Sequence, residues 1–584
     1  MDKLSLNYDY CEDDLENMDY LNVKNTQKYN PIYTKYFKLT ENNYNKITLN
    51  HQHKLLGVLE KKTFSTYLCK VGHKNNFQKK EVFVKFAPLI DPIKYMIGKY
   101  DFDNDSLFTL PQLNENTVVS KTKKKLEDYN NCAYVDGFFS FLTSKLLHDY
   151  KFLNSVDFYG SYLANHNNMK INIYDDIDFL NDSEDFHKSK NVHFEIDDDF
   201  YDELSNYDSN NNKKKINISG GEVDPLNIEE LADSSLENSK ENSKENSKEN
   251  SKEIDINKSF VNLSELNDLS LNFLDISSNI SKKDSRCSSL TCSSRSSNTE
   301  TDTDNEDEGK NDSECDESDE DDESDESDED EEREIFAYIK NFPVNLIMLE
   351  KCEQTLDSYM LKNELEETEW ECILLQIIFT LITYQKAFDF THNDLHTNNI
   401  MFTSTEKQFL HYTYNGKTYK IPTFGKMWKI IDFGRSIFSF SGNLITSDSF
   451  SSKGDAATQY NFGPYYNDKK PKVEPNKSFD LCRLGCSLFD YFIDNIKCIK
   501  DRRDCDNLQC LILEWCEDDK NKNVLYKNNG EERYPEFKLY KMISRTVHNH
   551  TPQLQLERVM FDKYRVSKKK LNKKTKIINI DAIP

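Results

Sequence analysis

The chain carries two short stretches close together, THNDLHTNN at residues 391–399 and IIDFG at residues 430–434. In the first stretch Asp394 stands two positions after His392 and five positions before Asn399. The second stretch is an Asp-Phe-Gly tripeptide at the end of an apolar run. Apolar, strand-like residues also follow the first stretch, so both motifs are predicted to adjoin β-strands.

This order, His-x-Asp-x-x-x-x-Asn and then Asp-Phe-Gly, is the signature of phosphoryl transfer from ATP in the protein-kinase superfamily. The chemistry needs a carboxylate that faces the acceptor hydroxyl, and Asp394 is the candidate. It also needs hard oxygen ligands for Mg²⁺, which Asn399 and Asp432 supply. The other motif residues are expected to be structural: His392, Phe433 and Gly434.

Composition bounds the class of protein. The net charge is −28, but residues 300–334 alone carry −21, which leaves an ordinary −7 for the rest of the 584 residues. The acidic block is therefore expected to be a solvated, self-repelling segment. The 14 cysteines form no Cys-x-x-Cys pair, and the N-terminus resembles no signal peptide, so we expect a reducing, cytoplasmic setting. The most apolar stretch, residues 372–384, is too short to span a membrane.

Patterning along the chain divides it into ordered and low-complexity parts. Strand patterns and a long amphipathic helix, residues 132–150, come before a Ser-, Asn- and acid-rich region that is predicted to be disordered. A hairpin with an Asn415-Gly416 turn lies between the two motifs. The predicted parts are an N-terminal extension (1–50), a β-rich region (51–166), the disordered insert (167–334), a strand and hinge (335–352), a helical region (353–560) and a basic tail (561–584).

The order of these parts resembles the protein-kinase superfamily, most of all the divergent serine/threonine-protein kinases of giant DNA viruses of the mimivirus type. The resemblance covers roughly residues 51–165 and 335–560. It implies an α+β, two-lobed fold, with a small antiparallel β-rich lobe, a larger helical lobe and the long acidic insert. It also implies ATP and Mg²⁺ as ligands.

The resemblance assigns further roles by position. Lys85 stands where the family places the lysine that holds the ATP phosphates, and Asp480 would brace the backbone of the catalytic loop. The hinge that pairs with adenine would comprise Leu349, as gatekeeper, with Glu350 and Cys352.

Two departures affect the ATP site. Of the family's glycine-rich loop only Gly57 remains, so nucleotide affinity is expected to be weaker or the loop remodelled. The family pairs its lysine with a helix glutamate, which residues 131–147 lack. Asp136 is the nearest acidic candidate and would need a closer helix because its side chain is shorter.

Two further departures affect regulation and acceptor. Asn393 replaces the arginine that binds a phosphorylated activation loop in regulated kinases, so loop phosphorylation is not expected to be the on-switch. His396 replaces the usual lysine and is assigned to the catalytic set. Haspin-like and aminoglycoside-phosphotransferase-like members share this histidine, which leaves the acceptor open.

Three functions follow from these observations. The first is a serine/threonine protein kinase, with an unknown protein substrate. The second is a pseudokinase scaffold that presents the acidic insert to basic partners, and the third is a small-molecule kinase. The basic tail lacks interleaved aromatics, so specific nucleic-acid readout is not expected, and neither is a membrane partner. The expected location is the host cytoplasm or a virion.

Overall fold

The structure is a computed structural model that describes residues 4, 6–11, 15–73, 76–100, 107–113, 121–197, 335–499 and 502–584. The chain divides into two units, residues 1–202 with 288–584 and residues 203–287, and every described residue belongs to the first. Most of the predicted insert therefore lies outside the described residues, and its disorder stays a prediction.

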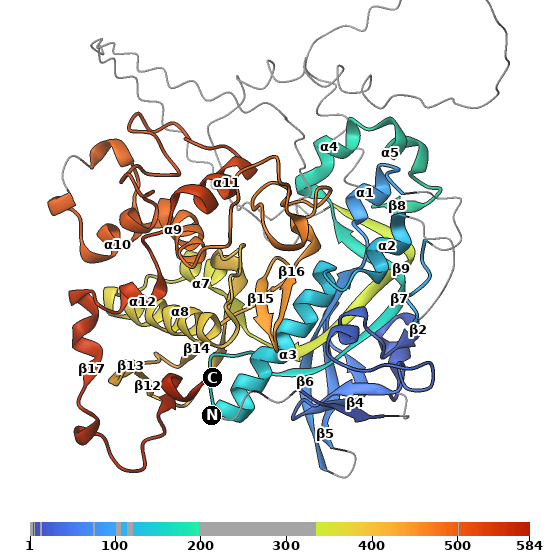
Figure 1. The fold of residues 1–584 in the computed structure, drawn as a ribbon, viewed down its shortest axis with the longest axis horizontal. Coiled ribbons are helices and arrows are strands. Elements are labelled where there is room, and N and C mark those ends of the chain that lie inside the picture. Colours follow the sequence, from blue (N-terminus) through green and yellow to red (C-terminus); the bar gives the residue numbers. More distant parts are fainter. Residues whose placement is uncertain are drawn as a thin grey trace, which may run out of the picture. The chain divides into compact units, whose positions relative to one another are not determined.

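A seven-stranded antiparallel sheet forms the first half of the described unit (Figure 1). A short strand, β8 (Phe194–Ile196), pairs with β9 near the point where the chain enters the insert. The other six strands follow one another in the order β2 (Val23–Gln27), β7 (Phe158–Asn172), β9 (Phe336–Glu350), β6 (Asn76–Pro88), β5 (Thr66–His73) and β4 (Lys54–Lys61).

Helix α3 (Cys132–Tyr150) packs against β7 and β9 of this sheet (Figure 1). Its bounds match the helix predicted from the sequence. Asn131 caps the helix, because its side chain accepts a hydrogen bond from the N–H of Ala133 at 3.0 Å. The ring of Phe139 stacks on Phe390 with centroids 4.4 Å apart, so the helix is anchored to the second half of the chain by aromatic packing.

The second half is built around α8 (Glu367–Phe388), which is buried along most of its length. A three-stranded sheet adjoins both motifs and comprises, in order, β10 (Gln354–Thr355), β11 (Ile400–Ser404), which directly follows Asn399, and β14 (Lys426–Ile430), which ends two positions before Asp432. The predicted Asn-Gly hairpin is confirmed as β12 (Phe409–Tyr414) and β13 (Lys417–Pro422). The remaining helices of this half are α7 (Leu356–Lys362), α9 (Phe479–Phe492), α10 (Asn507–Trp515), α11 (Phe537–Thr546) and α12 (Pro552–Gln555).

Short elements complete the described unit. They are β1 (Tyr8–Tyr10), β3 (Ile47–Leu49), α1 (Pro92–Met96), α2 (Lys121–Glu127), α4 (Ile177–Asn181), α5 (Glu184–Ser189), β15 (Ile437–Phe440), β16 (Asn443–Thr446), β17 (Arg565–Val566) and β18 (Ile578–Asn579). The mixed α+β class predicted from the sequence is confirmed.

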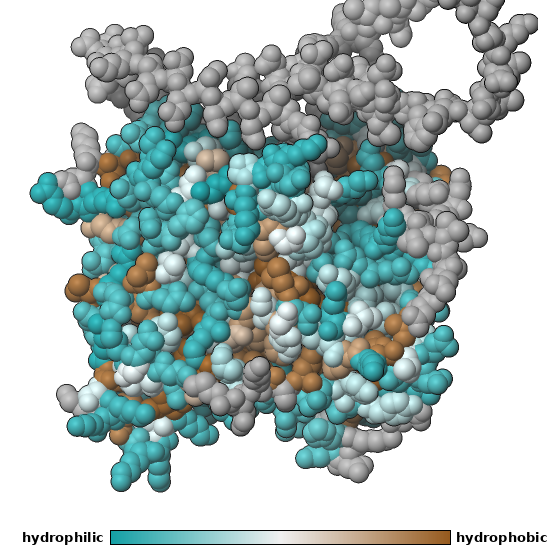
Figure 2. Space-filling view, in the orientation of Figure 1, coloured by the Kyte–Doolittle hydropathy of each residue, from teal (hydrophilic) through white to brown (hydrophobic). Residues whose placement is uncertain are grey.

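Helix α8 is the one helix of the described residues that is long and apolar enough to cross a membrane by length and composition. Its most apolar window has a mean hydropathy of 1.2, and 89% of that window is buried inside the structure, as in a core helix. The visible face of the unit is mostly hydrophilic, with apolar residues in small separate areas (Figure 2).

Several predicted boundaries are corrected by the structure. Residues 1–50 are not an irregular extension, because β2 joins the main sheet and Ile32 and Tyr33 are buried against the rest of the unit. The ordered chain continues past residue 167 through β7, α4, α5 and β8. The region predicted to be helical, residues 353–560, also contains the β15–β16 hairpin. These segments alternate apolar residues with Asn, Tyr and Ser, which hid their periodicity.

The basic tail packs onto the second half of the unit instead of extending from it. Strand β18 pairs with β12, and Ile578, Ile580 and Ile583 are buried. The ammonium group of Lys386 donates hydrogen bonds to backbone carbonyls of the last residues, Ile580 and Asp581 among them. The last seven residues of the predicted basic tail therefore pack through isoleucines rather than lysines.

Candidate active site

Asp480, in the first turn of α9, holds the backbone of the first motif. Its two carboxylate oxygens accept hydrogen bonds from the N–H groups of His392 and Asn393, each at 2.9 Å. Burial raises the pKa of Asp480 even though these donors favour its charged form. The bracing contact expected for Asp480 is present, so the loop that carries Asp394 is tied to a buried helix.

The second motif is tied to the first through its backbone. The imidazole Nε2 of His392 lies 2.9 Å from the carbonyl oxygen of Ile431, to which it can donate. Phe433 is buried, with its ring 4.8 Å from Phe139 of α3 and 6.0 Å from Phe390. Asp432 has a φ of +63°, a left-handed conformation that is uncommon for a non-glycine residue.

Lys85 lies between two carboxylates. Its ammonium group is 2.7 Å from Asp136 of α3 and 2.8 Å from Asp432. Burial alone would lower the pKa of Lys85, but the two carboxylates outweigh it and raise the pKa well above its usual value. The other oxygen of Asp136 accepts a hydrogen bond from the N–H of Phe433 at 3.0 Å. Asp136 thus joins the lysine, the helix and the Asp-Phe-Gly motif.

Asp394 is surrounded by donors that favour its ionised form. Its Oδ1 accepts a hydrogen bond from the hydroxyl of Tyr540 at 2.8 Å, and its Oδ2 lies 3.5 Å from the guanidinium of Arg435. Burial alone would raise the pKa of Asp394, but the positive charge of Arg435 and its other neighbours hold the pKa well below its usual range. An ionised carboxylate can accept a proton, as a general base must.

His396 and Asn399 form the other side of the loop. The amide nitrogen of Asn399 donates to the backbone carbonyl of Asp394 at 2.9 Å and lies 3.1 Å from Nε2 of His396. Burial lowers the pKa of His396 to about 4, so its imidazole is neutral at physiological pH. A neutral imidazole cannot replace the charge of the lysine that is usual at this position.

These residues fit a divalent cation. Asp432 keeps 41% of its side chain exposed, and among the described residues only one of its oxygens, Oδ1, has an ion pair. The amide nitrogen of Asn399 is used by two acceptors, which leaves the amide oxygen as the group for a cation. A carboxylate and an amide oxygen are ligands that Mg²⁺ accepts.

The predicted hinge lies at the end of β9. Leu349 is 8% exposed and pairs with Phe83 of β6. Glu350 contacts the buried Lys429, and its N–H donates to the carbonyl of Asp157 at 2.9 Å. Among the described residues, Cys352 shows no backbone hydrogen bond to protein, and the residue is partly buried.

Gly57 is not placed as predicted. It lies inside β4, and the turn between β4 and β5 is formed further on, at residues 62–65, without a glycine. A Cβ at position 57 would lie 2.7 Å from the Cβ of Glu16, whose backbone pairs with β4 there. Gly57 is therefore explained by the close approach of the segment around Glu16, not by the approach of a phosphate.

Sequence reasoning missed Tyr540, Arg435 and the partners of Asn393. The amide of Asn393 donates to the carbonyl of Arg435 at 2.9 Å and accepts from the hydroxyl of Tyr460 at 2.7 Å. Arg435 also forms an ion pair with Asp455 at 2.6 Å. The position of Arg435 next to Asp-Phe-Gly was a usable signal. Tyr540 had none, because 146 residues separate it from Asp394.

The chain shows distant, partial similarity to haspin kinases. A stretch of 76 residues is 38% identical to the serine/threonine-protein kinase haspin of Bos taurus and equally to that of Mus musculus, covering 13% of this chain and 10% of each relative. A stretch of 113 residues is 32% identical to the serine/threonine-protein kinase haspin homolog of Arabidopsis thaliana, covering 19% of this chain and 18% of that protein.

The matches span only a tenth to a fifth of the length of these relatives. No family model matches the sequence. The similarity supports the protein-kinase superfamily, whereas the predicted likeness to viral kinases stays a prediction.

Proposed function

We propose that this chain is an ATP- and Mg²⁺-dependent serine/threonine protein kinase. In this proposal the antiparallel sheet with α3 is the small lobe, residues 353–560 form the large lobe, and the end of β9 is the hinge. The sheet and the helical half described above, together with the partial similarity to haspin kinases, support the assignment. The activity, substrate and partners of the whole protein are part of the proposal.

The roles follow from the contacts. Asp394 accepts the proton of the acceptor hydroxyl while that oxygen bonds to the γ-phosphorus and the bond from phosphorus to the ADP oxygen breaks. Lys85, fixed by two carboxylates, presents an ammonium group to the phosphates. Mg²⁺, when bound by Asp432 and Asn399, would neutralise phosphate charge. His396 orients the amide of Asn399 rather than adding a charge.

One observation carries the proposal. Lys85, from the sheet, is held between Asp136 of α3 and Asp432 of the second motif. A structural lysine on a strand needs one partner, whereas this one joins three separate segments of the chain. The Lys85 side chain as a whole is 29% exposed, so it is only partly covered by these partners.

The test is transfer from radiolabelled ATP with Mg²⁺ to protein and to aminoglycoside acceptors. We expect Asp394→Asn to reduce the rate by at least about 10²-fold, as loss of a general base does, and Asp432→Asn to act similarly by removing a cation ligand. The matched control is Asp490→Asn, because Asp490 also accepts a tyrosine hydroxyl bond, from Tyr526, but lies outside the site. Wild-type protein that neither transfers phosphate nor binds ATP would overturn the proposal.

A pseudokinase scaffold is the second candidate. The glycine-free turn at residues 62–65 and the occupation of Asp394 by Tyr540 favour it. It predicts no transfer to any acceptor, with binding of basic partners retained. Transfer to aminoglycosides alone would instead identify a small-molecule kinase, the reading that His396 suggested.

The acidic segment, residues 300–334, is proposed to bind basic proteins in the cytoplasm of a host cell or in a virion. Its charge of −21 is the basis of this part of the proposal. Binding of the full chain to immobilised polylysine, compared with a variant that lacks residues 300–334, tests it. Equal retention of the two proteins would contradict the assignment.

A further inference from the structure

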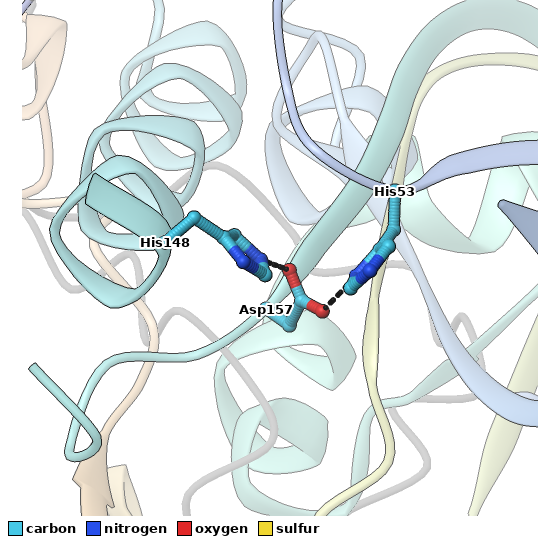
Figure 3. Close-up of side chains that lie close together, drawn as sticks. All are labelled: His53, His148 and Asp157. Atoms are coloured by element: carbon cyan, nitrogen blue, oxygen red, sulfur yellow. Dashed lines mark hydrogen bonds and ion pairs between the residues drawn. The ribbon is translucent and has the colours of Figure 1, made fainter. Parts of the chain in front are cut away.

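A second cluster of polar side chains comprises His53, His148 and Asp157. Nδ1 of His53 lies 3.0 Å from Oδ2 of Asp157, and Nε2 of His148 lies 2.7 Å from its Oδ1. Both imidazole rings point toward the same carboxylate (Figure 3). The three candidate ligand atoms all lie within 4.8 Å of one another.

Three elements bring these residues together. His53 immediately precedes β4, His148 lies in the last turn of α3, and Asp157 immediately precedes β7. The two rings are perpendicular, with centroids 4.9 Å apart, so neither ring stacks on the other and both present a nitrogen edge. Ser144, one turn before His148, donates a further hydrogen bond to Asp157 at 2.9 Å.

The charge of Asp157 is not matched by a permanent cation. Its side chain is only 6% exposed, and among the described residues its ion pairs are with the two histidines alone. A buried carboxylate needs a cation or hydrogen-bond donors beside it, and a metal ion held by both imidazoles would supply that positive charge.

We propose that His53, His148 and Asp157 bind a divalent first-row transition-metal ion, with Zn²⁺ as the natural occupant. Two imidazole nitrogens and a carboxylate oxygen are a ligand set that Zn²⁺ accepts. Ligand atoms around tetrahedral Zn²⁺ lie about 3.3 Å apart, given bond lengths of about 2.0–2.2 Å. The present separations, from 2.7 Å to at most 4.8 Å, bracket that value, so small side-chain rotations suffice.

The site can be reached from solvent and leaves a position for water. The side chain of His53 is 36% exposed and that of His148 is 18% exposed. An ion with three protein ligands keeps a fourth position open. The ion would replace the direct hydrogen bonds from the imidazoles to Asp157 with bonds to the metal, while Ser144 could continue to donate to the carboxylate.

Metal binding would link three segments of the fold. The ion would fasten the end of α3 to the start of β7 and to the segment before β4. Asp136 lies 12 residues before His148 on α3, about 18 Å along the helix axis. The carbonyl of Asp157 accepts the N–H of Glu350, so the same ion would hold the end of β9. The proposal does not depend on phosphotransferase activity.

The test uses the full chain, freed of metal with EDTA and then titrated with Co²⁺ and, separately, with Zn²⁺. We expect one equivalent of Co²⁺ with d–d absorption and no cobalt–thiolate charge-transfer band, because the proposed ligands are two imidazoles and a carboxylate. Zn²⁺ should displace Co²⁺ and raise the melting temperature. His53→Gln and His148→Gln should each weaken binding by at least about tenfold, since even residues that only support a ligand cause losses of that size.

The matched control is His548→Gln. Nδ1 of His548 lies 2.6 Å from Asp519, so this variant removes a histidine–aspartate contact that lacks a third ligand. It should bind Co²⁺ as the wild type does. Asp157→Asn adds a third ligand variant, and because His53 is partly exposed, the test stands even if Asp157→Asn fails to fold. No stoichiometric binding, a thiolate band, or unchanged affinity in His53→Gln would each overturn the proposal.

Discussion

Replacing Asp136 with Asn tests the connection between α3, Lys85 and the Asp-Phe-Gly motif. Asp136 is 2% exposed and accepts two hydrogen bonds, from Lys85 at 2.7 Å and from the N–H of Phe433 at 3.0 Å. The Asn side chain keeps the shape but has one acceptor oxygen and no charge. It can satisfy one of the two donors and must turn its NH₂ group toward the other.

The expected loss of unfolding free energy follows from the interactions that Lys85 keeps in Asp136→Asn. A hydrogen bond to a charged group contributes about 1.5–3 kcal/mol. Removing one member of a buried ion pair costs about 3–5 kcal/mol when the other is left alone. Lys85 keeps Asp432 at 2.8 Å, so the lower range applies. We expect Asp136→Asn to reduce the free energy of unfolding by about 2 kcal/mol, measured by urea denaturation.

The same change should affect nucleotide binding. Lys85 would then be held by Asp432 alone and would compete with a cation for that carboxylate. A loss of about 1.4–2 kcal/mol corresponds to a tenfold or greater rise in the Kd for ATP. The Kd can be measured by calorimetry, which does not require turnover.

The matched control is Asp149→Asn on the same helix. Asp149 pairs with Lys145 at 2.9 Å and is 39% exposed, so its loss should change stability by less than about 0.5 kcal/mol. If Asp136→Asn were no more destabilising than Asp149→Asn and left the Kd for ATP unchanged, the role given to Asp136 would be refuted.

Four further predictions rest on separate features. Tyr540→Phe removes the hydroxyl that donates to Oδ1 of Asp394, so kcat/KM should rise about two- to tenfold. A fall in kcat/KM would contradict this and show that Tyr540 positions Asp394; Tyr526→Phe is the control. The free energy of unfolding should decrease as pH falls from 6.5 to 4, because burial lowers the pKa of His51, His166 and His396 to about 4 and the unfolded chain therefore binds more protons. Each histidine contributes up to about 1.4 kcal/mol per pH unit, and urea midpoints that do not change with pH would contradict this prediction. Replacing the exposed residues Ser441, Ser452 and Thr458 with Ala should leave specific activity nearly unchanged, because the segment after Gly434 is held by the contacts of Asn393 and Asp455 rather than by a phosphate. A large loss of activity in the labelled-ATP assay would contradict this prediction. Gly57→Ala should destabilise by about 1–3 kcal/mol through contact with Glu16, and a neutral denaturation midpoint would argue against that packing.

Local patterns were sufficient for the elements with strong periodicity. The helix at residues 132–150 was predicted with correct bounds because a capping Asn131 precedes a continuous apolar face. The Asn415-Gly416 turn identified its hairpin because a tight two-residue turn needs positive φ at both positions, here +48° and +69°. Asp480 was assigned from the family resemblance, and Asp136 was proposed as the nearest acidic residue on a helix that lacks the family's glutamate.

The remaining features depend on contacts between distant segments. Local sequence patterns do not indicate the hydrogen bond between Tyr540 and Asp394, since a single tyrosine on a helix is ordinarily a packing residue. Gly57 was assigned to phosphate binding because the segment that covers it, around Glu16, gives no strand signal of its own. The C-terminal segment was predicted to be a basic tail because of its lysines, whereas three buried isoleucines determine where its end packs.

The pairing of β8 with β9 has a practical consequence for the segment between them. Ile196 lies opposite Ala337, and the N–H of Asp197 donates to the carbonyl of Phe336 at 3.0 Å, so the chain leaves and returns at neighbouring points. Residues 198–334 can therefore be exchanged for a linker of about ten residues without moving either strand. Shortening the closed loop from about 140 residues to about ten should stabilise the protein by about 2 kcal/mol on chain entropy alone. The junction is therefore a suitable position for insertions and deletions in the coding sequence, because the two strand ends stay paired whatever segment joins them.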